Sequence, residues 1–469
     1  MNDYIEIYIT GLSGYFLGIF YMIYAILGTI ILFRDDEYYN NDPMYLMQNV
    51  CMFLFHFTAF LCLCFKSGDM KLLGFYIACQ LLMLGIIVVG KILYPYADRL
   101  FTNNMCMLMT TGFVILTRLN YNKALKQFFI VSISMMLSMG VPYVVRRFKF
   151  LHTFKWIYAS IGIATLGIVL IAGTVTYGAN ISYTLRGITF QPSEIIKIVF
   201  VFFVASGFVR ARSMSEVIVT SSMALVHVLI LVLSKDLGSA LIYAFIYVVM
   251  VFVATGNFLY VVGAAMLGGA GTLMAYRTFT HVQERIDAWI DPWITIDNSG
   301  YQVTQSLFAL SSGSTWGVGL MNGNPSAIPF VEDDFVFSAI VEEMGFTVGI
   351  SLLAVCIISF LRALKMGAGL RSMFYRLLAV GLGSGYIFQV FLTVGGGVKF
   401  IPLTGVTLPF VSYGGSSVLT SIVLFGVLSG ISMLIQDERD FYEREEAKYD
   451  EEDDEEDYEE DSFKKRRTH

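Results

Sequence analysis

The sequence predicts an all-α fold, a polytopic transmembrane helical bundle of about 13 spans with one large extracellular loop. Of the 469 residues, 56% are hydrophobic and only 14% are charged, which is more apolar surface than one globular interior can bury. The apolar residues also form continuous runs, and a helix needs roughly 20 of them to cross a bilayer. A membrane β-barrel would instead show short alternating segments.

The predicted spans follow one another along the whole chain up to residue 435. The run at 102–118 is among the shortest. An odd number of spans puts the two ends of the chain on opposite faces of the membrane. The thirteen runs are 12–33, 45–65, 72–93, 102–118, 125–145, 155–177, 193–209, 217–233, 238–254, 258–275, 335–361, 376–394 and 412–435.

The orientation is predicted from Lys and Arg in short connections, because cytoplasmic loops carry an excess of them. Three connections on one face are basic: Arg146, Arg147, Lys149 and Lys155; Arg210 and Arg212; Arg362, Lys365, Arg371 and Arg376. We therefore expect a multi-pass protein of the bacterial cytoplasmic membrane, with loop 276–335 outside and the C-terminus in the cytoplasm. Seven basic residues fall on the other face: Lys66, Lys71, Arg118, Lys123, Arg186, Lys235 and Lys399.

The net charge of −6 comes from the end of the chain. Residues 437–469 hold 17 acidic and 7 basic residues, so the rest of the chain has a balance of +4. Like charges at this density repel and stay solvated, which predicts an acidic, disordered cytoplasmic tail. The mildly basic body suits an anionic lipid or a pyrophosphate, although ordinary cytoplasmic loops supply the same excess.

All six cysteines fall in apolar runs, without a Cys or His neighbour at metal-ligand spacing. Buried cysteine behaves as a small hydrophobic residue, so no metal site is predicted from them. The first apolar run is too long for the core of a cleavable signal peptide and lacks a small-residue cleavage site.

The interval 276–335 is a long polar stretch between two spans, and it is too rich in aromatic residues to be disordered. It ends at Asp334, where the chain re-enters the bilayer. A partly desolvated carboxylate there has a raised pKa and suits a general base. An N-cap favoured by the helix dipole explains an Asp at this position equally well. Residues 334, 338 and 342 share a helical face, which predicts that Glu342 faces the same cavity as Asp334.

Three further segments place polar groups at membrane entries. Glu194 and Lys197 are three residues apart on one face, either as a self-compensating pair or as a charged cavity wall. Asp236 lies in a tight reversal between two spans, which a simple hairpin turn also explains. Segment 405–417 combines Pro409 with Gly414 and Gly415, which indicates either a re-entrant segment lining a cavity or close helix packing.

Together these segments resemble the shape, elongation, division and sporulation family, whose members include FtsW, RodA and SpoVE. The matching stretches occur in the family's order and cover roughly residues 102–435. They are Phe190–Lys197, Lys235–Ala240, Gly300–Gln305 with Ser311–Gly319, Asp334–Phe337 with Glu342–Gly345, and Gly405–Ser417.

The resemblance implies a peptidoglycan glycosyltransferase that polymerises lipid II at the outer face of the membrane, with a class B penicillin-binding protein (a transpeptidase) as partner and no nucleic-acid partner. It implies that Asp334 is catalytic; whether a divalent cation (Mg or Mn) assists is left open by the sequence. It also implies an extra three-helix membrane extension at 1–95 before the family core at 96–436. The substrate-binding residues implied are Glu194, Lys197, Asp236, Arg285, Gln305, Glu343 and Ser412.

Two other functions are compatible with the same segments. A flippase for lipid-linked precursors would also need a polar cavity and a lateral opening, but its ionisable residues would spread toward the bilayer midplane. Here they gather at outer helix ends, which favours surface chemistry. An inactive scaffold that recruits a transpeptidase is the third possibility. Polymerisation of purified lipid II separates the enzyme from both.

Overall fold

The computed structural model describes residues 2–34, 40–176, 179–185, 188–209 and 214–439. Within these residues, twelve helices are long and apolar enough to cross a membrane, and one further apolar helix, α7 (Lys155–Ala172), is shorter. The predicted class, a helical transmembrane bundle, is confirmed, and each of the thirteen predicted runs coincides with helix over most of its length.

The first half of the described chain contains α1 (Asn2–Phe33), α2 (Asp42–Ser67), α3 (Lys71–Leu93), α4 (Arg99–Leu119), α5 (Tyr121–Ser138), α6 (Val141–Arg147), the short 3₁₀ helix η1 (Lys149–Thr153) and α7. The second half contains α8 (Pro192–Val209), α9 (Met214–Leu233), α10 (Leu237–Thr255), α11 (Phe258–Thr278), α12 (Thr280–Ile290), α13 (Tyr301–Gly313), the 3₁₀ turn η2 (Pro325–Ala327), α14 (Val336–Gly369), α15 (Met373–Gly397) and a C-terminal helix, Gly415–Arg439.

A small antiparallel sheet interrupts the helices between α7 and α8. Its strands are β1 (Thr174–Thr176), β2 (Ala179–Leu185) and β3 (Ile188–Phe190), paired in the order β1-β2-β3. The register places Thr174 opposite Ser182 and Thr184 opposite Thr189. The run predicted at 155–177 therefore ends as a helix at Ala172, and the chain continues in β1. Thr and Val at 174–176 favour an extended backbone over a further helical turn.

Helix α4 lies at the centre of the bundle. In its apolar stretch 94% of the residues are buried, against 28% in α3. Polar side chains of α4 bind three neighbouring helices: Asn104 accepts from Tyr24 Oη of α1 at 3.1 Å and donates to Ser359 Oγ of α14 at 2.9 Å, while Asn103 donates to Gln48 Oε1 of α2 at 3.2 Å. These hydrogen bonds tie the N-terminal helices to the rest of the bundle.

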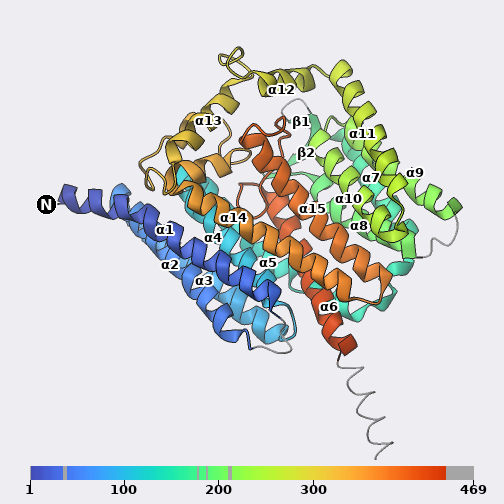
Figure 1. Cartoon of the computed structure of the whole chain (residues 1–469), viewed down its shortest axis with the longest axis horizontal. Coiled ribbons are helices and arrows are strands. Elements are labelled where there is room, and N and C mark those ends of the chain that lie inside the picture. The colour runs from blue at the N-terminus through green and yellow to red at the C-terminus, as the bar shows by residue number, and fades with distance from the viewer. Residues whose placement is uncertain (1, 35–39, 177–178, 186–187, 210–213, 440–469) are drawn as a thin grey trace, which may run out of the picture.

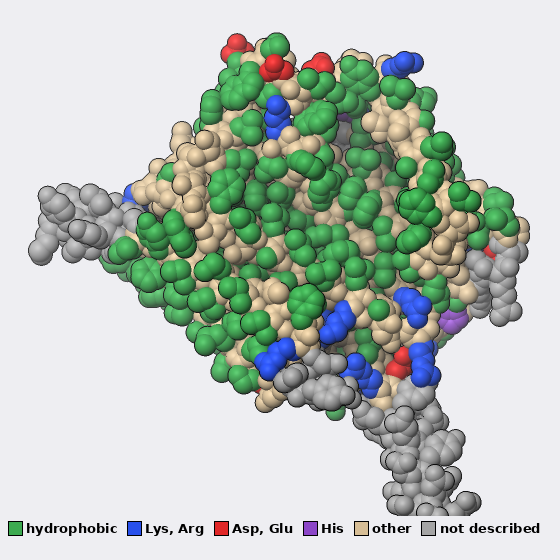
Figure 2. Space-filling model, in the orientation of Figure 1, with side chains coloured by type: hydrophobic (Ala, Val, Ile, Leu, Met, Phe, Trp, Pro, Cys, Tyr) green, Lys and Arg blue, Asp and Glu red, His purple; other side chains and the backbone are tan. Residues whose placement is uncertain are grey.

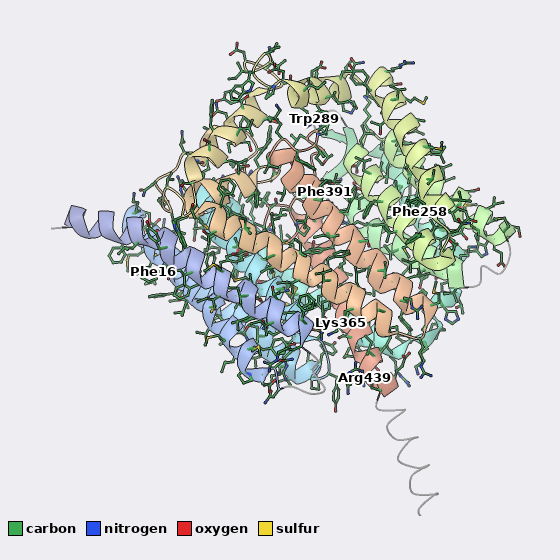
Figure 3. All side chains as sticks on the ribbon, viewed as in Figure 1. Phe16, Phe258, Trp289, Lys365, Phe391 and Arg439 are labelled. Carbon is green, nitrogen blue, oxygen red and sulfur yellow. The ribbon has the colours of Figure 1, made fainter. Side chains whose placement is uncertain are left out.

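One end of the bundle carries the long connection between α11 and α14, with α12 and α13 lying across it (Figure 1). We call this the loop end and the other the opposite end. Figure 2 shows a broad belt of hydrophobic side chains between the two ends. Most of the visible Lys and Arg lie near the opposite end, and most of the visible Asp and Glu lie at the loop end. Lys365 and Arg439 lie at the opposite end and Trp289 at the loop end (Figure 3). The protein is therefore a multi-pass membrane protein.

Of the predicted acidic tail, residues 437–439 belong to the C-terminal helix, and Asp437 binds Arg146 with its two carboxylate oxygens at 2.6 and 2.9 Å. Residues 440–469 lie outside the described part of the chain, as do Arg186, Arg210 and Arg212.

Candidate active site

The turn 330–335 carries Asp334 at the start of α14 and is held in place by backbone hydrogen bonds. The amides of Asp333 and Asp334 both donate to Phe330 O, at 3.1 and 3.2 Å. The next residue, Phe335, is 1% exposed and anchors the turn in the core. The position of Asp334 is thus fixed by its own turn and by the buried ring that follows it.

A second segment, 402–414, fixes the same turn from the side. It is non-helical between α15 and the C-terminal helix, and its residues from 408 to 412 are all buried. The amide of Tyr413 donates to Glu332 O at 2.9 Å, and Ser412 Oγ donates to Asp333 O at 2.6 Å. Of the two readings of the 405–417 sequence, the structure shows a non-helical segment inside the bundle, in contact with the residues around Asp334.

The carboxylate of Asp334 accepts no side-chain or backbone hydrogen bond from any residue in the described part of the chain. Burial raises its pKa to about 7, with the neighbouring carboxylate of Asp333 adding to the rise and Arg285 opposing it. Burial likewise raises the pKa of Asp333 to about 6. A carboxylate with a pKa near 7 is half deprotonated at neutral pH and is suited to accept a proton.

Arg285 of α12 borders the same small space as Asp334, across Gly405. An atom placed at the Cβ position of Gly405 would lie 3.4 Å from Arg285 Nη2 and 3.9 Å from Asp334 Oδ2. Gly405 has a φ of 73°, and Arg285 Nη1 donates to the adjacent Thr404 O at 3.1 Å. A side chain at position 405 would enter the gap between the acid and the cation, so the glycine keeps that gap open.

Asp236 caps α10 and joins it to α8. Its Oδ2 accepts from Ser193 Oγ at 2.9 Å and from Gln191 Nε2 at 3.1 Å, and its Oδ1 accepts from the amide of Ser239 at 3.2 Å. Burial raises the pKa of Asp236, and these hydrogen bonds oppose the rise. Its charge also acts on Arg285, so Asp236 belongs to the surroundings of the site. Its hydrogen bonds therefore cap α10 and attach it to the start of α8.

Glu194 and Lys197 of α8 form a buried ion pair at 3.0 Å. Lys197 Nζ also donates to Gln389 Oε1 of α15 at 2.5 Å, and Gln389 Nε2 donates to Thr407 O at 3.0 Å. The pair therefore connects α8 through α15 to the 402–414 segment. Glu194 already neutralises the positive charge of Lys197. Arg285 is the cation whose charge acts on Asp334.

Helix α14 is broken at Gly345, where φ is 87° and ψ is 167°. Residues 314–319 fill the break: the amides of Val318 and Gly319 donate to the carbonyls of Glu342 and Glu343 at 2.9 and 3.1 Å. On the other side of Gly345, the amide of Phe346 donates to Ser314 O at 3.0 Å. The half-helix 336–344 is thus a separate short element that begins two residues after Asp334.

Glu342 and Glu343 lie at the far end of this half-helix and bind another part of the loop. Glu342 Oε1 accepts from the amide of Asn324 at 2.8 Å. Glu343 Oε1 accepts from Arg118 Nε at 2.8 Å, and Arg118 also reaches Gly323 O at 3.1 Å. Ser338 lies between these glutamates and Asp334 in the sequence, and its hydroxyl forms a hydrogen bond with Ser306 Oγ at 2.6 Å. The expectation that Glu342 and Asp334 share a cavity is therefore wrong; the glutamates hold segment 321–324.

Two predicted substrate-binding residues, Ser412 and Gln305, remain to be placed. Ser412 is buried and positions the turn before Asp334. Gln305 is half-buried on α13, and its side chain makes no hydrogen bond with the residues that the structure describes. Sequence reasoning missed Lys123 of α5, which pairs with Glu332 at 3.0 Å, lies 5.3 Å from the centre of the Tyr413 ring and lowers the pKa of Asp333. Lys123 and Arg118 stood out only as basic residues on the face expected to lack them.

The site thus combines an unpaired carboxylate of raised pKa with a guanidinium beside it, at the loop end of a membrane bundle. A general base and a cation so placed suit the deprotonation of a hydroxyl that attacks a carbon bearing an anionic leaving group. The described residues contain no group of three or more His, Cys, Asp or Glu side chains able to enclose a metal ion. The fold and the site define a polytopic membrane protein with an unpaired carboxylate beside an arginine at one end of its helical bundle.

Comparison with protein families narrows this class. The family model of the FtsW, RodA and SpoVE cell cycle proteins matches residues 70–436. The chain belongs to this family, and the resemblance stated from its motifs is confirmed.

Individual relatives agree with this assignment. Peptidoglycan glycosyltransferase RodA of Mycobacterium tuberculosis is 34% identical over 271 residues, which cover 54% of this chain and 58% of that protein. Stage V sporulation protein E of Bacillus subtilis is 28% identical over 285 residues, covering 57% of this chain and 75% of that protein. The match therefore spans less than two thirds of the length of the mycobacterial relative.

Two solved structures share the fold. RodA of Thermus thermophilus has a TM-score of 0.53 at 22% identity, covering 72% of this chain and 97% of that one. A chain from a peptidoglycan synthase complex, studied for its coordination of polymerization and crosslinking, has a TM-score of 0.61 at 22% identity, covering 72% and 98%.

Proposed function

We propose that this protein is a peptidoglycan glycosyltransferase that polymerises lipid II into glycan strands at the outer face of the cytoplasmic membrane, during elongation, division or sporulation. The observation that carries the proposal is the free carboxylate of Asp334, with a pKa of about 7, facing Arg285 across Gly405. The family assignment and the relatives named as peptidoglycan glycosyltransferases support it.

In the proposed step, Asp334 accepts the proton of the acceptor sugar's 4-hydroxyl. The freed oxygen bonds to C1 of the donor sugar, and the bond from C1 to the undecaprenyl pyrophosphate breaks. General-base catalysis of this kind contributes roughly 10²–10⁴-fold. The proton ends on Asp334 and the electron pair leaves with the pyrophosphate.

Arg285 is the residue we assign to the pyrophosphate. It is planar and permanently charged, and it presents a fork of donors that matches phosphate oxygens. Thr404 O holds Nη1, and Nη2 is directed toward the gap at Gly405. Lys197 is less suited to this role because Glu194 and Gln389 already occupy its ammonium group.

A divalent cation remains part of the proposal. Magnesium is usually held by one or two carboxylates together with substrate phosphates, and the unpaired Asp334 and the adjacent Asp333 offer such ligands. Bound there, the ion would neutralise charge on the leaving group. Chelation of Mg²⁺ or Mn²⁺ should therefore lower lipid II polymerisation by the wild-type protein.

The proposed orientation places the loop end outside the cell and the C-terminus in the cytoplasm. The basic side chains near the opposite end support it. We also propose a transpeptidase of the class B penicillin-binding type as partner, since the fold matches a chain from a complex in which polymerization and crosslinking are coordinated.

The decisive experiment is polymerisation of purified lipid II by the purified protein and by Asp334→Asn. We expect glycan strands from the wild type and a loss of about 100-fold or more in the variant, with unchanged thermal unfolding. The matched control is Asp297→Asn, an exposed loop aspartate, which should polymerise normally.

Each alternative function predicts a different outcome. A flippase would move lipid II across vesicle membranes without making strands. An inactive scaffold would do neither. Full activity of Asp334→Asn would remove Asp334 from the base role even if the protein polymerises lipid II.

A further inference from the structure

A groove outside the candidate active site lies between α3 and the pair α5–α6, with α4 and the C-terminal helix as its floor. Its volume is about 330 Å³, and its walls are almost entirely apolar. Residues that line it include Leu82, Ile86, Met105, Met135, Met136 and Phe425. It runs from the middle of α3 to Tyr94, whose hydroxyl donates to Met139 O.

The groove lies toward the opposite end of the bundle, away from Asp334. The C-terminal end of α2, just before α3, reaches the loop end, because Lys66 binds Asn322. Helix α3 runs from there, so its last residues lie at the opposite end, as does Arg146, which binds Asp437 of the C-terminal helix. The site is therefore separate from the reaction site.

Glycines on α3 create the space. A Cβ at Gly85 or at Gly90 would meet no other atom within 4 Å, so these glycines border open volume. Gly426 on the floor is different, because its Cβ would lie 3.4 Å from Val141 and the glycine permits close packing. Larger residues at 85 and 90 would fill the groove without a clash.

The lining and the position of the groove select a hydrocarbon chain. An apolar cavity of about 150 Å³ stays dry and takes up small apolar molecules, and this groove is more than twice that size. Its rim is lipid-facing: Met136 is 74% exposed. In a membrane, a groove of this kind fills with a chain of a neighbouring lipid.

The polar end of the groove selects the head group. Pro142 lines the groove, and the next residue, Tyr143, begins a second hollow of about 330 Å³ that is lined by Arg146, Arg147, Lys149 and Asp437. Arg146 is paired with Asp437. Arg147 and Lys149 are exposed, and their side chains have no acidic partner among the described residues. Basic pockets between helices at this side of a membrane bind anionic lipid head groups.

We propose that the groove binds one acyl chain of an anionic phospholipid, whose phosphate lies in the adjoining hollow against Arg147 and Lys149. In the orientation proposed above, this lipid belongs to the cytoplasmic leaflet. The lipid would fill the groove between α3 and α5–α6. It would thereby hold the N-terminal helices against the bundle at the opposite end.

The test measures lipid binding to the purified full chain in detergent by native mass spectrometry, with phosphatidylglycerol and phosphatidylcholine of identical acyl chains. Wild type should retain phosphatidylglycerol in preference to phosphatidylcholine. The double variant Gly85→Leu/Gly90→Leu should bind both lipids about tenfold less, the equivalent of two buried methylene groups. Arg147→Gln/Lys149→Gln should lose only the preference, by about fivefold for each charge removed.

Matched controls lie on the helices that border the groove. Gly74→Leu on α3 is also free of neighbours within 4 Å but outside the groove, and Lys126→Gln removes an exposed charge from the other end of α5. Both should bind lipid as wild type does. If the leucine pair impairs folding, Gly85→Ala/Gly90→Ala should fold and bind both lipids at an intermediate level.

Three outcomes would overturn the proposal. The first is unchanged phosphatidylglycerol binding by Gly85→Leu/Gly90→Leu and by Gly85→Ala/Gly90→Ala. The second is equal binding of the two phospholipids by wild type. The third is displacement of phosphatidylglycerol by undecaprenyl phosphate, which would assign the groove to a polyprenyl chain instead.

Discussion

At the scale of single residues, the carboxylates near the loop end differ chiefly in their partners. Asp236 accepts hydrogen bonds from three groups, and Glu343 is paired with Arg118. Asp334 has neither a donor nor a pair among the described residues, although desolvation by its surroundings raises its pKa to about 7. A carboxylate left in this condition costs stability, and such a cost persists where the group has a function.

The pH dependence of polymerisation follows from the pKa of Asp334. Because the base form acts, activity should rise with pH through about 7 and fall below it. Asp333→Asn removes a neighbouring negative charge that raises this pKa, so the acidic limb should move to lower pH. Arg285→Gln removes a cation that lowers it, so the limb should move to higher pH, on top of a lower rate. The measurement is the pH profile of kcat/KM.

The control for these profiles is Glu284→Gln, an exposed residue next to Arg285. It changes the charge of α12 without facing the gap at Gly405 and should leave the limb in place. If all three variants shift the limb in one direction, the titrating group is not Asp334.

Sequence reasoning at this scale found the acid and its cation but not the residues that hold them. Asp334 stands in a recognisable motif, and Arg285 was implied by the family resemblance. Arg118 and Glu343 are 225 residues apart, and Lys123 and Glu332 are also remote in sequence. Pairing over such separations leaves no local pattern in one chain. The only trace was that Lys66, Arg118 and Lys123 broke the charge asymmetry of the membrane, and all three bind the long loop or its junction with α14.

At the scale of elements, the break in α14 is the feature with most consequence for the site. The φ and ψ of Gly345 fall in a region that is essentially restricted to glycine. A Cβ there would lie 2.4 Å from Gly317 N and 2.4 Å from Thr315 O. Irregular backbone at membrane depth is tolerated where it is buried in protein, and segment 314–319 supplies the missing partners.

Gly345→Ala should therefore displace either the half-helix or segment 314–319. The backbone strain alone costs about 1–3 kcal/mol, and a shift of about 1 Å at Asp334 can lower the rate about 100-fold. The measurements are thermal unfolding in detergent and lipid II polymerisation. Gly369→Ala, in the same helix but without neighbours within 4 Å, is the control and should change neither. Wild-type activity in Gly345→Ala would show that the break is not needed to place Asp334.

Apolar periodicity predicted where helices lie but not where they break or what they surround. The run 335–361 reads as one continuous span, because a single glycine in an apolar helix is common in membranes. The run 102–118 was among the shortest, yet α4 is the most enclosed helix of the candidate spans, at 94%. Its polar Asn and Thr residues lower its hydropathy, and Asn103, Asn104 and Thr111 among them bind neighbouring helices.

At the scale of the whole molecule, the N-terminal helices contact the loop that leads to the site. A Cβ at Gly14 would lie 2.2 Å from Trp316 O, and one at Gly18 would lie 2.9 Å from the Trp316 ring. Tyr15 packs on the same ring, with centroids 5.1 Å apart. Trp316 belongs to segment 314–319, which fills the break at Gly345. Helix α1 therefore supports the half-helix 336–344 by packing against this segment.

Gly14→Val should push Trp316 away and lower polymerisation by up to about 100-fold, with a smaller effect on KM because no substrate contact is removed. Ile26→Phe, on the lipid-facing side of the same helix, is the control. Purified protein and a lipid II titration separate kcat from KM. Unchanged kinetics in Gly14→Val would mean that α1 contributes only to stability.

The orientation of the bundle can be tested by cysteine labelling in intact cells. In a background without the half-buried Cys64, Ser299→Cys in the long loop should react with a membrane-impermeant maleimide, while Ala368→Cys at the end of α14 should react only after lysis. The other native cysteines are buried. The reverse pattern would place Asp334 in the cytoplasm and contradict the proposed function.

The way the turn at 330–335 is fastened has a mechanical consequence. Tyr413, Ser412 and Lys123 fix one side of it, Phe335 anchors it below, and the filled break at Gly345 immobilises the far end of the half-helix. The backbone that carries Asp334 is thus fixed on several sides. In the reaction proposed above, the glycan and its lipid carrier would then be the moving components, advancing by one unit past a stationary proton acceptor in each round of chain growth.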